Sequence, residues 1–174
     1  MAVGCYPGSF NPPTVAHLAV ADAGRRQAGL VRVDLVLSQA ALGKPAGVGP
    51  SVGERRKVLE AVAATRPWLG VVVTNARLIA DIAAGYDAVL LGADKWAQLL
   101  DAAWYGGSAA ARDDALAALP RVLVAPRAGE RPPGVELLDL PDHVRDVSAS
   151  AVRDGHGAAA AWILPEAEAS GLWR

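Results

Sequence analysis

Thr14 and His17 stand three positions apart, directly after the run Gly8-Ser9-Phe10-Asn11-Pro12-Pro13. Thr14 is a favourable N-cap for a helix expected from residue 15 to about residue 23, and residues three apart share one side of the first helical turn. That turn offers free backbone N–H groups and the positive end of the helix dipole, so it favours phosphate. The spacing therefore predicts a phosphate site that Thr14 and His17 face together.

A second group of polar residues lies near the other end of the chain, in Val147-Ser148-Ala149-Ser150-Ala151-Val152-Arg153. Ser148 is a suitable cap for a short helix, and Gly155 is a suitable end for it. This arrangement predicts that Arg153 lies beside two hydroxyl groups near a helix start. The alternative interpretation is a capped surface helix with an exposed arginine.

The elements that must position these residues alternate along the chain. Apolar, β-branched runs predict strands at residues 2–6, 31–37, 68–74, 87–92, 121–125 and 135–138. Helices are expected at residues 15–23, 51–65, 76–84, 95–103 and 109–119, the second opened by a Ser51-x-x-Glu54 capping box. Strands alternating with helices predict an α/β fold with a doubly wound, Rossmann-like parallel sheet, in one domain over residues 1–174.

Ligands of open parallel sheets bind beyond the carboxyl ends of the strands, where the strand order reverses. The segments that follow the first, second, fourth and fifth strands are residues 7–17, 38–44, 92–96 and 126–127. Each is polar, glycine-rich or charged, so we expect the site there.

The two end segments carry a family resemblance. Gly8-Ser9-Phe10-Asn11-Pro12 followed by Thr14-x-x-His17 resembles the signature of nucleotidyltransferases with a (His/Thr)-x-Gly-His motif. Residues 147–153 resemble the Ile-Ser-Ser-Thr-x-Ile-Arg motif of that family. Ala16 stands where the first motif has glycine, and Ala149 where the second has serine. The resemblance implies catalytic contacts from Thr14, His17 and Arg153. It implies nucleotide contacts from Gly8, Ser9, Phe10, Ser148 and Ser150.

The middle of the chain is similar to the family more loosely. Gly92 and Asp94 resemble a Gly-x-Asp segment near the nucleotide ribose, and Lys44 resembles a lysine that neutralises phosphate. Trp104 and Tyr105 stand where mononucleotide adenylyltransferases stack an aromatic ring on the pyridine of the acceptor. The structural alternatives are an N-cap for Asp94, a solvated Lys44 and a core Trp104.

Composition excludes several other classes of protein. The 174 residues are 52% hydrophobic with a net charge of −1 and no basic run, which argues against a nucleic-acid binder. No apolar run is long enough for a membrane span, so we expect a cytoplasmic protein without membrane partners. Cys5 is the single cysteine, and no spacing of histidines and carboxylates suggests a metal site built by the protein. A homo-oligomer is compatible with the sequence.

The resemblance implies nucleotidyl transfer to a small molecule. A phosphate of the acceptor attacks the α-phosphate of ATP, which carries Mg²⁺, and pyrophosphate leaves. The layout is most similar to the mononucleotide adenylyltransferases, which implies nicotinate or nicotinamide mononucleotide as acceptor. The alternatives are adenylyl or cytidylyl transfer to another acceptor such as phosphopantetheine, and a nucleotide-binding protein without catalysis.

Overall fold

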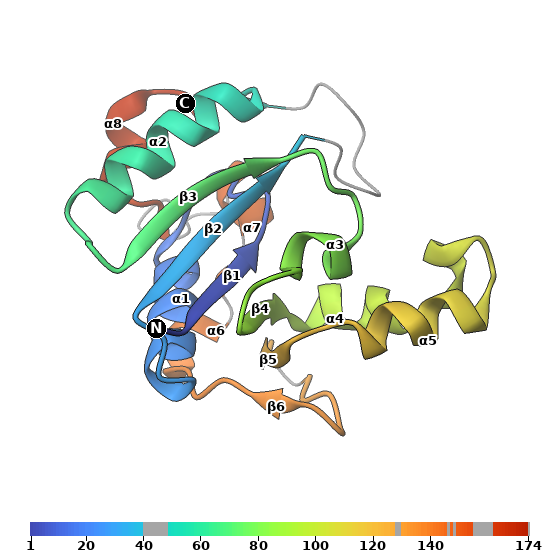
Figure 1. Cartoon of the computed structure of the whole chain (residues 1–174). Helices are drawn as coiled ribbons and strands as arrows, with labels where there is room; N and C mark the ends of the chain where they lie inside the picture. Colours follow the sequence, from blue (N-terminus) through green and yellow to red (C-terminus); the bar gives the residue numbers. More distant parts are fainter. Residues whose placement is uncertain (40–48, 128–129, 146, 148, 155–161, 174) are drawn as a thin grey trace.

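Six parallel strands build the sheet. The computed structural model describes residues 1–39, 49–127, 130–145, 147, 149–154 and 162–173, without the side chains of residues 150 and 151. Within these residues the strand order is β3-β2-β1-β4-β5-β6, and each neighbouring pair is parallel (Figure 1). The strands are β1 (Val3–Pro7), β2 (Arg32–Ser38), β3 (Leu69–Thr74), β4 (Ala88–Gly92), β5 (Arg121–Ala125) and β6 (Glu136–Leu137). The doubly wound, Rossmann-like sheet predicted from the sequence is confirmed.

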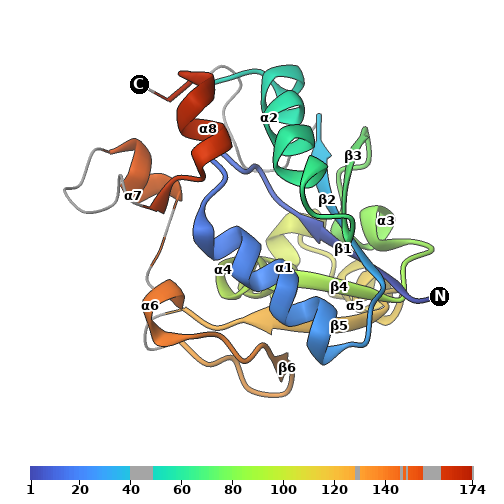
Figure 2. The ribbon, with the colours of Figure 1, turned by 90° about the vertical axis from the view of Figure 1, so that its left-hand side faces the viewer.

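Helices cover both faces of this sheet (Figures 1 and 2). On one face lie α1 (Val15–Gln27), α2 (Val52–Ala64), α6 (Asp142–Arg145) and α8 (Pro165–Ser170). On the other lie α3 (Ile79–Ala83), α4 (Ala93–Leu100) and α5 (Ala109–Ala117). A 3-10 helix, η1 (Ala102–Tyr105), joins α4 to α5, and α7 (Ala149–Arg153) precedes the C-terminal segment.

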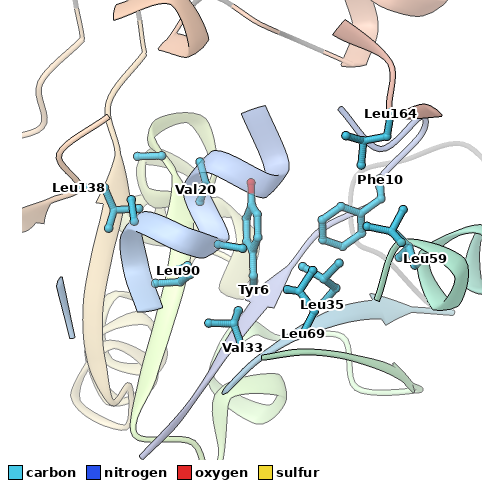
Figure 3. Packing of buried hydrophobic residues seen from close by; sticks show 14 of the residues in the cluster. Tyr6, Phe10, Val20, Val33, Leu35, Leu59, Leu69, Leu90, Leu138 and Leu164 are labelled. Carbon is cyan, nitrogen blue, oxygen red and sulfur yellow. The ribbon is translucent and has the colours of Figure 1, made fainter. Parts of the chain in front are cut away.

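Each face has its own apolar cluster, because successive side chains of a strand point to opposite sides. On β1, Cys5 packs against α3 and α4, whereas Tyr6 packs beneath α1. The larger cluster includes Phe10, Leu59 and Leu164, which lie together beside Tyr6 (Figure 3). The loop after β1 is therefore anchored in the core through Phe10.

Two expected helices differ from the observed ones because side chains bond to nearby backbone. The helix expected at residue 76 begins only at Ile79: the Ala76 N–H donates to Thr74 Oγ1 (3.1 Å), and Ser38 Oγ donates to the Ala76 carbonyl (2.7 Å). The helix expected over 95–103 begins at Ala93 and ends at Leu100. Asp101 then accepts the Ala103 N–H (2.9 Å) and starts η1.

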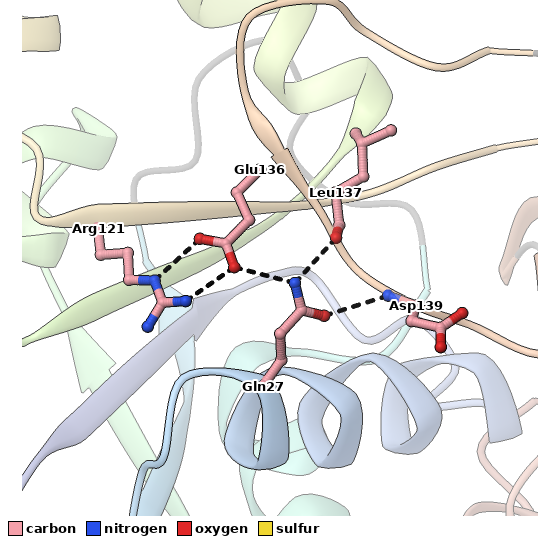
Figure 4. A network of polar contacts seen from close by, with 5 residues as sticks. All are labelled: Gln27, Arg121, Glu136, Leu137 and Asp139. Carbon is pink, nitrogen blue, oxygen red and sulfur yellow. Dashed lines mark hydrogen bonds and ion pairs between the residues drawn. The ribbon is translucent and has the colours of Figure 1, made fainter.

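A polar network fastens the short edge strand β6 (Figure 4). Arg121 on β5 forms an ion pair with Glu136 (2.8 Å), which holds the pKa of that carboxyl below its usual value. Gln27, the last residue of α1, donates to Glu136 Oε1 (2.9 Å) and to the Leu137 carbonyl (3.0 Å). It also accepts the Asp139 N–H (3.2 Å), so the end of α1 and the sheet edge are held as one unit.

Candidate active site

A cavity of about 1480 Å³ opens at the carboxyl ends of β1 and β4, between which the strand order reverses. Three of the four segments expected at the site contribute to its wall, with Gly8 after β1, Ser38 at the end of β2 and Gly92 at the end of β4. The volume exceeds the roughly 300–1,000 Å³ of a pocket for one small ligand. It has room for two substrates side by side.

His17 lines this cavity, and Thr14 holds its ring. The Thr14 N–H donates to His17 Nδ1 (2.9 Å), and Thr14 Oγ1 lies 2.9 Å from the same nitrogen. Because Nδ1 accepts a hydrogen bond, the proton of the neutral ring resides on Nε2. The observed pair thus caps α1 and supplies a histidine whose Nε2–H can donate. Thr14 is 1% exposed, which gives it a positioning role rather than a direct contact with ligand.

Phe10 supports the same imidazole from the core. Its ring is 1% exposed and packs edge-on against His17 (centroids 5.0 Å apart) and against Tyr6 (5.5 Å). Phe10 has a φ of +44°, a conformation that residues with side chains rarely adopt. An added Cβ at Gly8 would lie 2.8 Å from the Phe10 ring, so this close approach requires glycine. Of the expected nucleotide contacts, Gly8 and Ser9 line the cavity, whereas the Phe10 side chain packs away from it.

The two ends of the chain meet at Asn11. Arg153, on α7, donates to the Asn11 backbone carbonyl. Trp173 Nε1 donates to the Asn11 side-chain oxygen (2.6 Å). The first and last sequence motifs, distant along the chain, are thus brought together at one loop beside the cavity.

Among the described residues, three cationic side chains line the cavity, and Arg153 is not one of them. Arg55 lies in the first turn of α2 and donates to the carbonyls of Ser9 (2.5 Å) and Pro50 (3.1 Å). Lys95 on α4 donates to Gln98, and burial lowers the pKa of its ammonium. Arg77 follows β3, between Thr74 and α3. The anionic groups of nucleotides suit a wall with these charges.

The segment after β4 also contributes to the cavity wall. Asp94 forms an ion pair with Arg127, which follows β5, so the ends of β4 and β5 are tied together. Trp104, 37% exposed on η1, lines the cavity together with Tyr105. The Tyr105 hydroxyl donates to the Leu99 carbonyl (3.2 Å), and burial raises the pKa of that hydroxyl. Trp104 and Tyr105 thus add an aromatic surface to the cavity wall.

Sequence reasoning did not single out Arg77 and Lys95. Lys95 directly follows Asp94 in a segment that was expected to contribute, so its position was a usable signal. Arg77 follows the third strand, whose end was not among the expected segments. Lys44 and Ser148 lie outside the described residues, as does the side chain of Ser150.

Metal-binding groups and membrane-spanning helices were looked for among the described residues only. There, no three His, Cys, Asp or Glu side chains are grouped so that they could hold a metal ion. Over the same part of the chain, every helix is too short or too polar to cross a bilayer.

Comparisons with known proteins place the chain among nucleotide-transferring enzymes. The sequence model of a family described as cytidylyltransferase-like matches residues 5–154. A comparison with curated proteins gives no match. Among solved structures, the chain is similar to nicotinic acid mononucleotide adenylyltransferase of Plasmodium falciparum complexed with NaAD. The TM-score is 0.67 at 13% identity, over 97% of this chain and 93% of that one, which shows a shared fold.

Proposed function

The chain belongs to the cytidylyltransferase-like family of nucleotidyltransferases, and we propose that it transfers the adenylyl group of ATP to nicotinate or nicotinamide mononucleotide. The observation that carries the proposal is the contact of Arg153 with Asn11, in the loop that leads to His17 and borders a cavity with room for two substrates. Adenylyl rather than cytidylyl transfer is supported by the structural similarity to a mononucleotide adenylyltransferase. The aromatic surface of Trp104 suits a pyridine ring.

The reaction needs no protein nucleophile, because such transfers depend on positioning and on neutralised charge. An oxygen of the acceptor phosphate forms a bond to the α-phosphorus of ATP. The bond from that phosphorus to its bridging oxygen breaks, and the electron pair leaves with pyrophosphate. His17 donates its Nε2–H to the α-phosphate as negative charge develops there.

Arg153, the last residue of α7, donates to the Asn11 carbonyl in the loop before α1, and we assign its guanidinium to the β- and γ-phosphates, which carry the charge that leaves. Mg²⁺ would enter with ATP and neutralise the triphosphate further. In this arrangement the nucleotide is surrounded by Gly8, Ser9, Gly92 and Asp94. Lys44, Ser148 and Ser150 remain predicted contacts.

Pyrophosphate release tests the proposal. Purified protein is supplied with Mg·ATP or Mg·CTP and with nicotinate mononucleotide, nicotinamide mononucleotide or phosphopantetheine. We expect release only when ATP and a pyridine mononucleotide are both present. Release with CTP but not with ATP would identify cytidylyl transfer. Release with phosphopantetheine would identify a different acceptor. ATP binding without release from any pair would indicate a nucleotide-binding protein without catalysis.

A further inference from the structure

Arg77 differs from the other cations of the cavity wall. Arg55 and Lys95 each donate to a neighbouring oxygen. In the part of the chain that the structure describes, the Arg77 guanidinium has neither a hydrogen bond nor an ion pair, although it lines the cavity. Arg77 is exposed, so its guanidinium is accessible to an anionic ligand, to which it can donate two hydrogen bonds.

The backbone that carries Arg77 is held in place. Both polar backbone groups of its neighbour Ala76 are bonded, to Thr74 Oγ1 (3.1 Å) and to Ser38 Oγ (2.7 Å). On the other side, the Leu78 carbonyl accepts the Ile82 N–H (3.0 Å). The backbone on both sides of Arg77 is thus already ordered, so a ligand that binds there does not have to order it.

Apolar residues lie next to Arg77 in the wall of the cavity. Leu78, Ile79 and Ile82 supply an apolar wall beside it, and Trp104 lies in the same cavity. The acidic residues that line the cavity already have partners: Asp94 pairs with Arg127, Asp101 accepts the Ala103 N–H, and Glu54 accepts the Ser51 N–H. Arg77 is thus a cationic residue of the cavity wall beside apolar residues, which suits a ligand that carries an anionic group on an apolar ring.

We infer that Arg77 is the specificity-determining residue for the acceptor: it binds an anionic group on the pyridine ring and selects nicotinate over nicotinamide mononucleotide. This inference rests on the proposed function. The two acceptors share ribose and phosphate and differ only in a carboxylate against a neutral carboxamide. A guanidinium can donate two parallel hydrogen bonds to a carboxylate, whereas a carboxamide offers one oxygen and no charge.

Equilibrium binding tests the inference without requiring turnover. Each mononucleotide is titrated calorimetrically into the wild type, Arg77→Gln and Arg77→Lys, with and without α,β-methylene-ATP, which cannot transfer its adenylyl group. Arg56→Gln is the matched control, because Arg56 pairs with Glu60 on the exposed side of α2. Pyrophosphate release is measured in parallel with Mg·ATP.

We expect Arg77→Gln to weaken nicotinate mononucleotide binding by roughly 10- to 100-fold, the range of a lost charged hydrogen bond. Binding of nicotinamide mononucleotide changes by less than about 2-fold, Arg77→Lys is intermediate, and Arg56→Gln resembles the wild type. Equal losses for both acceptors, no loss, or a wild type that binds neither would overturn the inference. Arg77-dependent selection without pyrophosphate release would support the inference and contradict the transfer reaction instead.

Discussion

At the scale of single residues, the His17 imidazole combines a structural contact with a proposed chemical one. Its Nδ1 accepts the Thr14 N–H and so caps α1, while Nε2 carries the proton that we assign to the α-phosphate. A glutamine at this helix position can provide the same cap, as it does in a capping box, but it lacks the imidazole N–H. The two contributions can therefore be separated by substitution.

We predict that His17→Gln lowers kcat by roughly 100- to 1,000-fold, the usual loss for one positioned donor, and leaves the free energy of unfolding within about 0.5 kcal/mol. His17→Ala should lose similar activity and, in addition, about 1 kcal/mol of stability with the cap. Pyrophosphate release and urea unfolding measure the two effects. Full activity in either variant would remove His17 from the chemistry.

Ala16 stands where related motifs have glycine, and its surroundings explain why a methyl group fits. Ala16 packs against the main apolar cluster and does not line the cavity. We predict that Ala16→Gly changes kcat/KM for ATP by less than about 3-fold and destabilises the fold by about 0.5–1 kcal/mol, because glycine weakens a helix. An activity gain of 10-fold or more would show that the methyl group obstructs the phosphates.

The sequence predicted which residues lie together better than it predicted what surrounds each of them. The spacing of Thr14 and His17 correctly indicated that they lie together at a helix start. It could not indicate that Thr14 is buried, because Thr14 forms a β-bridge with Ile163, which lies near the other end of the chain. Similarly, α3 begins later than expected because the Thr74 and Ser38 side chains bond to the Ala76 backbone, and such bonds cannot be recognised from the periodicity of the sequence.

At the scale of elements, the C-terminal segment supports the loop that borders the cavity. The Leu164 N–H donates to the Pro13 carbonyl (3.2 Å), and Glu166 on α8 pairs with Arg66 beyond α2 (3.1 Å). α8 lies beside α2 in both overall views (Figures 1 and 2). Through Trp173, this segment also holds the Asn11 side chain. No periodic pattern predicted α8, because its six residues form too few turns to show one.

We predict that Trp173→Phe keeps the aromatic packing, removes the hydrogen bond to Asn11 and weakens Mg·ATP binding by roughly 3- to 10-fold, at a cost of about 1 kcal/mol in stability. Calorimetric titration measures the affinity. Trp68→Phe is the matched control, because Trp68 directly precedes β3, at the amino end of that strand, and contacts Arg25. Equal loss of affinity in both variants would mean that general destabilisation, and not the Asn11 contact, is responsible.

At the scale of the whole molecule, Cys5 reports on the stability of the sheet. It lies on β1, fully buried between β2 and β4, and it is the single cysteine. Burial and the nearby Asp34 raise the pKa of its thiol from 9.0 to about 12. Above pH 9 the unfolded chain therefore loses this proton while the folded chain keeps it, so ionisation of the thiol lowers stability as the pH rises.

Thiol labelling at pH 8 should therefore require global unfolding, because only the exposed thiol forms a reactive thiolate and β1 is central to the sheet. The cavity that we assign to ATP lies at the carboxyl end of the same strand, so unfolding that exposes Cys5 also destroys the site. Mg·ATP at 100 times its Kd should then slow labelling about 100-fold, since a ligand of the folded state lowers the unfolded population by that factor. CTP at the same concentration, which we expect to bind weakly, is the control. If calorimetry shows ATP bound while labelling slows by less than about 3-fold, Cys5 is exposed by a local opening that leaves the nucleotide site intact.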